Sequence, residues 1–218
     1  MSSPKPDVAA AVRAVALSSA SDALAPGLAD PVHDAQRCFR ALLQALSEPG
    51  APVALPVLTA PGVPLLPALA SVLLTLLDGD TRVALDAGSA ATRWLRFHTS
   101  APTSTVEEAD FVVVTDPACR PALSALASGS DESPERGATL LMALPALDGG
   151  VPTRWRGPGI CGERAVALPL PPAFWHEWRA SQASFPRGVD VLFVGPDAVI
   201  GLPRSTAVAL DAPAVTGA

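Results

Sequence analysis

The chain has 218 residues, 49% of them apolar, with a formal net charge of −6 and a pI near 5.0. A nucleic-acid-binding protein needs a basic face that neutralises phosphates, so this acidic balance argues against nucleic acid as a partner. Cys38, Cys119 and Cys161 are too few and too far apart for a disulfide framework or a zinc site, and free thiols suit a reducing cytoplasm.

Composition divides the chain into three expected parts. Residues 1–29 are rich in Ala, Ser and Pro without an apolar face, so we expect a flexible tail. Residues 30–206 are expected to form a single α/β domain, followed by a frayed tail over residues 207–218. The longest apolar run, residues 63–77, is interrupted by prolines and is too short for a bilayer, so no membrane partner is expected.

Helices are expected where apolar residues recur at helical spacing. Asp30-Pro31 is typical of a helix start, and Pro49-Gly50 ends the first helix. The other expected helices cover residues 65–77, 90–98, 121–127 and 173–184.

Strands are expected where short runs of β-branched and other apolar residues lie between turn signals. They cover residues 52–57, 81–85, 110–115, 139–144, 165–168, 189–194 and 198–202. The last two flank Gly195-Pro196-Asp197, which predicts an antiparallel hairpin. Alternating helices and strands with a late hairpin predict an α/β layer fold with a mixed sheet.

The candidate ligand-binding segment is Arg154-Trp155-Arg156-Gly157-Pro158-Gly159-Ile160. Glycines let a backbone approach a ligand closely, and Arg154 and Arg156 could hold a phosphate or phosphonate, with Arg164 nearby and Arg136 as an additional candidate. The alternative is a turn whose arginines face solvent or a subunit contact, because the strand–helix context of a phosphate fingerprint is missing. No catalytic residue and no metal ligand is predicted.

The lysine and tryptophan residues bear on mechanism and on assembly. Lys5 is the only lysine, so the expected domain offers no candidate for a mechanism that needs a buried amine nucleophile. Trp155, Trp175 and Trp178 are aromatic anchors of the kind enriched at protein interfaces, and we expect at least one of them at a subunit contact of a homodimer.

A series of short motifs follows in order over residues 30–205: Asp30-Pro31-Val32-His33-Asp34-Ala35-Gln36-Arg37, Phe39-Arg40, Ser47-Glu48-Pro49-Gly50, Leu76-Leu77-Asp78 with Thr81, Ala109-Asp110-Phe111, Gly129 with Pro134, Gly137-Ala138-Thr139-Leu140, Gly157-Pro158-Gly159-Ile160, and Phe185-Pro186 with Gly188 and Asp190. In this order the motifs resemble the H subunit family (PhnH) of the bacterial carbon–phosphorus lyase core complex. The resemblance implies a three-layer αβα sandwich like the large domain of pyridoxal-phosphate-dependent transferases, without their cofactor.

The resemblance also implies a function and a set of partners. A PhnH subunit works with G, I and J subunits to transfer an alkylphosphonate onto ribose C1 of a nucleoside triphosphate, taken with Mg as substrate, releasing the purine. The leading hypothesis is therefore an assisting, non-catalytic subunit in the cytoplasm, a homodimer when isolated. The alternative is a stand-alone phosphate- or phosphonate-binding protein or small enzyme with its pocket at residues 154–160.

Overall fold

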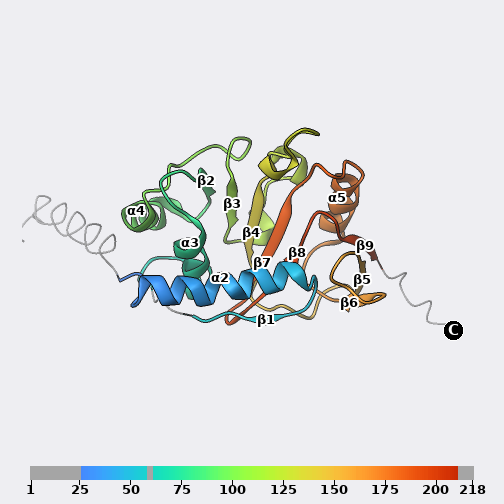
Figure 1. Ribbon diagram of the computed structural model, residues 1–218, viewed down its shortest axis with the longest axis horizontal. Coiled ribbons are helices and arrows are strands. Elements are labelled where there is room, and N and C mark those ends of the chain that lie inside the picture. Colours follow the sequence, from blue (N-terminus) through green and yellow to red (C-terminus); the bar gives the residue numbers. More distant parts are fainter. Residues whose placement is uncertain (1–25, 58–60, 211–218) are drawn as a thin grey trace, which may run out of the picture.

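A computed structural model describes residues 26–57 and 61–210 of the chain, which form two β-sheets surrounded by helices (Figure 1). The larger sheet has six strands in the order β1-β8-β7-β4-β3-β2. In chain order these strands are β1 (Val53–Ala54), β2 (Val83–Leu85), β3 (Phe111–Val114), β4 (Thr139–Ala143), β7 (Asp190–Val194) and β8 (Ala198–Leu202).

The large sheet is mixed, as the sequence predicts. Strands β2, β3, β4 and β7 pair in parallel, whereas β8 returns antiparallel to β7 and β1 pairs antiparallel to β8. The turn between β7 and β8 is closed by the Gly195 amide, which donates to the Ala198 carbonyl. The predicted hairpin at residues 195–197 is therefore confirmed.

Alternating side chains of the large sheet bury two separate cores. Val113, Leu141 and Leu192 belong to one cluster, and their neighbours Val112 and Leu140 belong to the other. Since successive strand residues point to opposite faces, the two clusters lie on opposite sides of the sheet. Both faces of the sheet are thus covered.

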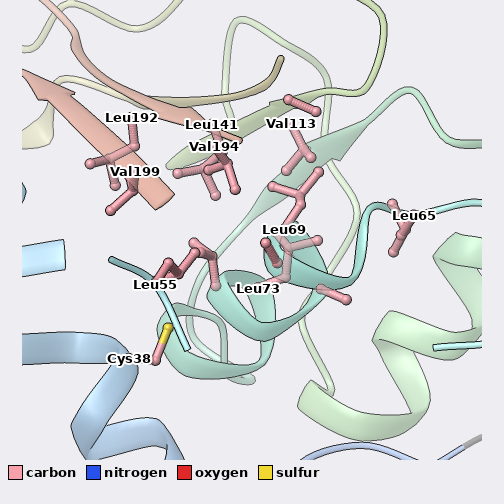
Figure 2. Packing of buried hydrophobic residues seen from close by; sticks show 14 of the residues in the cluster. Cys38, Leu55, Leu65, Leu69, Leu73, Val113, Leu141, Leu192, Val194 and Val199 are labelled. Carbon is pink, nitrogen blue, oxygen red and sulfur yellow. The ribbon is translucent and has the colours of Figure 1, made fainter. Parts of the chain in front are cut away.

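Helices α2 (Pro31–Ser47), α3 (Pro67–Leu76) and α4 (Gly88–Thr99) cover the first face. The Asp30 side chain accepts a hydrogen bond from the His33 amide, and Pro31 occupies the first turn of α2, as predicted for this helix start. Figure 2 shows Leu69 and Leu73 of α3 gathered beneath strand side chains such as Val113. None of the helices in the described ranges is long and apolar enough to cross a membrane.

The second face is covered by α5 (Pro172–Gln182), by short 3₁₀ turns and by a second, three-stranded antiparallel sheet. The strands of this small sheet are β5 (Thr153–Arg156), β6 (Arg164–Val166) and β9 (Ala207–Leu210), with β5 in the centre. Figure 1 shows α5 and the small sheet together at one end of the molecule, with α3 and α4 at the other.

Four expectations need correction. Residues 121–127 form a 3₁₀ turn, Leu123–Ala125, and no α-helix. Residues 207–210 form the paired strand β9, where we expected a frayed tail. Residues 153–156 form the strand β5, which we did not anticipate. Trp155, Trp175 and Trp178 are each at most 1% exposed within one chain, so the expected contact through these tryptophans is wrong.

The expected N-terminal tail lies mostly outside the described residues. Its described end, residues 26–29, precedes α2, and a Cβ at Gly27 would lie 3.0 Å from the His98 side chain on α4. The chain therefore packs against the domain by residue 27, three residues before the expected start of the domain at residue 30.

Candidate anion-binding groove

Strand β5 places two arginines on one outward face. Thr153 and Trp155 are buried, whereas Arg154 and Arg156 alternate with them and are exposed. The Trp155 indole N–H donates to Thr153 Oγ1 at 2.8 Å, and the Thr153 hydroxyl donates to the Val166 carbonyl at 2.7 Å. These buried bonds fix the strand, so both guanidinium groups project from the same side of the small sheet.

Small residues flank these arginines on the neighbouring strands. Arg154 lies opposite Ala165 on β6 and Ala209 on β9, and Arg156 lies opposite Ala207. Because alanine side chains are short, nothing on the neighbouring strands covers the guanidinium groups. The side chains of Arg154 and Arg156 are 54% and 71% exposed.

Glu163 connects the two arginines. Arg154 Nη1 donates to Glu163 Oε1 at 2.8 Å, and Arg156 Nε donates to Oε2 at 2.6 Å. The hydrogen bond from Arg154, followed by that from Arg156, lowers the pKa of Glu163. The carboxylate stays ionised at neutral pH and holds both guanidinium groups in place, while its single charge offsets only one of them.

Helix α5 supplies a third arginine. A groove of about 460 Å³ is lined by Arg154, Arg156 and Glu163 on one side and by Arg179 and Gln182 of α5 on the other, with β9 along its floor. Within the described residues, Arg179 makes no ion pair. Three guanidinium groups and one carboxylate leave two positive charges in excess, which suits an oxyanion such as a phosphate.

The glycines of the candidate segment approach the protein's own backbone. A Cβ at Gly159 would lie 2.0 Å from the Ser47 carbonyl oxygen at the end of α2, and one at Gly157 would lie 3.1 Å from the Ser205 carbonyl. The Ile160 amide closes the turn on the Gly157 carbonyl at 3.1 Å. Packing of this turn against α2 and residue 205 accounts for both glycines, and neither lines the groove.

Two other arginines considered from the sequence lie elsewhere. Arg164 Nη1 donates to the carbonyls of Glu48 and Pro49, so this side chain holds the C-terminal end of α2. Arg136 is exposed at the end of the 3₁₀ turn Pro134–Arg136 and does not line the groove. The structure thus brings together Arg154 and Arg156, and it leaves Arg136 apart.

Comparison with known proteins decides the family. A family model described as "Bacterial phosphonate metabolism protein (PhnH)" matches residues 26–209. This chain belongs to the PhnH family. Among PhnH relatives, alpha-D-ribose 1-methylphosphonate 5-triphosphate synthase subunit PhnH of Rhizobium meliloti (strain 1021) is 40% identical over 183 residues, covering 82% of this chain and 92% of that protein. The putative C-P lyase subunit protein HtxG of Stutzerimonas stutzeri is 34% identical over 172 residues, covering 78% and 84%.

The PhnH match reaches residue 209 and includes every residue that lines the groove except Leu210, yet the sequence predicted only part of the groove. Arg179 and Gln182 lie three residues apart on α5 and therefore share a helix face, which was the available signal. Without the placement of α5 beside the small sheet, that face reads as ordinary solvated surface. Glu163 gave no separate signal, because its partners are seven and nine residues earlier in the chain.

Proposed function

We propose that this PhnH-family chain is an assisting subunit of a carbon–phosphorus lyase core complex. In this role it supports the transfer of an alkylphosphonate onto ribose C1 of a nucleoside triphosphate, with release of the purine. The observation that carries the proposal is the 40% identity to the Rhizobium synthase subunit over 92% of that protein. A match over 82% of this chain and 92% of the relative favours a shared role of the whole domain over a shared fragment.

The proposed partners are the G, I and J subunits of the complex in the cytoplasm, with a homodimer when the chain is isolated. Both relatives are named as subunits, which supports assembly with partner proteins in general. The net charge of −6 favours protein and small-molecule partners over nucleic acid.

The groove on the small sheet is proposed to hold a phosphate or phosphonate group. Arg154 and Arg156 would bind its oxygens from the strand, and Arg179 would bind them from α5, each through N–H donors of a planar fork. Gly157 and Gly159 would act indirectly by holding the turn that follows β5 against α2. Arg136 would contribute only long-range attraction from outside the groove.

The fold is proposed to be related to the large domain of pyridoxal-phosphate-dependent transferases. The support is a mixed sheet with α2, α3 and α4 on one face and α5 on the other. The chain would use this arrangement without a cofactor bound as a Schiff base, because its one lysine, Lys5, precedes the family match.

Co-purification tests the proposed role. A tagged chain co-expressed with G, I and J subunits should recover all three in a constant ratio, and omitting it should abolish phosphonate-dependent purine release by the remaining subunits. Recovery of the tagged chain alone, with full activity of the others, would overturn the proposal. If the isolated chain itself released free purine from a nucleoside triphosphate, the stand-alone alternative would hold instead.

A further inference from the structure

A second hollow lies beside the anion-binding groove and shares two of its lining residues. It has a volume of about 390 Å³ and is lined by Arg179, Gln182, Ala183, Phe185 and Ser205. Arg179 and Gln182 line both spaces, so the groove and the hollow are neighbours on the surface. The groove carries the arginines of β5, and the hollow carries an aromatic ring, that of Phe185.

Phe185 gives the second hollow an exposed aromatic surface. Its side chain is 59% exposed, and no described aromatic ring packs against it. A solvent-facing phenyl ring offers a flat apolar surface on which a nucleobase can stack, and such stacking tolerates any base. Beside it, the Gln182 amide carries both donors and an acceptor, and the Ser205 hydroxyl carries one of each, which matches the mixed edges of a base.

We propose that the groove and the hollow together bind a nucleoside polyphosphate, with the phosphates on Arg154, Arg156 and Arg179 and the base against Phe185. The inference rests on the proposed anion site and adds the class of its ligand and the residues that receive the base. The excess of two positive charges suits a polyphosphate chain better than a single neutral group. Phe185 then selects nucleotides over inorganic polyphosphate.

Titration calorimetry on the full isolated chain separates the two ends of the site. ATP should bind more tightly than tripolyphosphate, and Phe185→Ala should lower ATP affinity about tenfold while leaving tripolyphosphate affinity unchanged. The matched control is Phe97→Ala on α4, since Phe97 is 58% exposed and outside both spaces. Arg156→Gln should weaken both ligands, whereas Arg93→Gln, at an exposed position on α4, should weaken neither.

Each outcome decides a different part of the proposal. Equal affinities for ATP and tripolyphosphate, with Phe185→Ala behaving like Phe97→Ala, would overturn the base assignment and leave the anion site standing. Absence of tripolyphosphate binding, or no effect of Arg156→Gln, would overturn the anion site and with it the nucleotide site. If Phe185→Ala loses its fold by circular dichroism, Phe185→Leu keeps an apolar side chain without a flat ring and should show the same selective loss.

Discussion

The arginines of this chain differ in their burial and in their hydrogen-bond partners. Arg120 is only 9% exposed, and it donates from both terminal nitrogens to the Glu177 carboxylate at 2.7 and 2.9 Å while lying over the Phe174 ring. Arg204 is held by the Asp190 carboxylate, to which it donates from Nε and Nη2. The arginines of the groove are exposed instead. Burial therefore separates Arg120 and Arg204, which serve the fold, from the exposed arginines of the groove.

Glu177→Gln is expected to destabilise the protein because it leaves the Arg120 guanidinium largely buried without its carboxylate. A hydrogen-bonded charge of this kind contributes about 2 kcal/mol, a value that already allows for solvent screening of the partly exposed Glu177. Denaturant unfolding monitored by tryptophan fluorescence measures the loss, and Glu132→Gln, an exposed glutamate outside this contact, is the reference.

The ion pair between Arg120 and Glu177 also makes the stability of the fold depend on pH. The hydrogen bond from Arg120, helped by the Leu123 amide, lowers the pKa of Glu177 in the folded chain. A lowered pKa stabilises the fold above the ordinary glutamate value of about 4.3, and this contribution disappears as pH falls through the lowered pKa. The stability gap between wild type and Glu177→Gln should therefore be full at pH 7 and should close in acid; a gap that persists at pH 2 would contradict this account.

The single lysine of the chain limits where pyridoxal phosphate can attach. Because Lys5 is the only lysine, pyridoxal phosphate followed by borohydride should label Lys5 or the N-terminal amine and nothing within residues 26–210. Peptide mass mapping after reduction locates the label. A reduced adduct on any peptide of the folded part would show that another nucleophile holds the cofactor.

The helices and strands differ in how clearly the sequence pattern predicts them. Strands β3, β4 and β7 were predictable because each is a short apolar run buried on both faces. Strand β5 was missed because exposed arginines alternate with its buried residues in a segment that also contains glycine and proline. Residues 121–127 gave a false helix, since buried Leu123 and Leu126 are three apart, a spacing that a 3₁₀ turn satisfies as well as an α-helix.

The turn after β5 should depend on Gly159 through packing as well as backbone conformation. Gly159 and Gly162 both have φ near +80°, at +82° and +73°, but only at Gly159 would a Cβ meet the Ser47 carbonyl, whereas nothing lies within 4 Å of a Cβ at Gly162. Gly162→Ala should cost about 1 kcal/mol from the left-handed conformation alone, and Gly159→Ala about 3 kcal/mol with the added clash. Equal melting temperatures for the two variants would refute the packing role.

Strand β9 is expected to contribute to stability despite its place near the chain end. It pairs along the whole of β5, buries Val208 against the second core, and follows Thr206, whose carbonyl accepts the Trp178 indole N–H at 3.0 Å. Ending the chain after Thr206 should cost about 3 kcal/mol and lower the melting temperature by about 10 °C relative to a chain ending after Leu210. A difference below about 2 °C would support the frayed tail that we first expected.

In the molecule as a whole, the tryptophans are buried in the protein core. Trp155 and Trp175 pack edge to face with ring centroids 6.0 Å apart, and Trp178 is bonded to the Thr206 carbonyl. The two cores cover both faces of the large sheet. The apolar side chains that stay exposed therefore lie mainly on the outer faces of helices. Among the described residues, Val32, Phe39 and Leu43 are exposed on α2, and their spacing of seven and four residues places them on one helix face.

The isolated chain is still predicted to form a homodimer, with its contact outside the tryptophan cluster. Sedimentation at micromolar concentration should give twice the 22.2 kDa of one chain. Trp155→Ala should lower stability by roughly 3–5 kcal/mol, as loss of a core side chain does, without changing the mass of the folded fraction.

Phe39→Ser should weaken association without lowering stability, because an exposed apolar side chain contributes to association more than to folding. It should weaken the dimer at least tenfold and leave the unfolding midpoint of the monomer unchanged, while Phe97→Ser on α4 serves as the matched exposed control. A wild type that sediments as a monomer would remove the homodimer from the proposed assembly. A dimer weakened equally by both substitutions would show that the contact is not specific to α2, and a dimer weakened by neither would place it on a surface away from both helices.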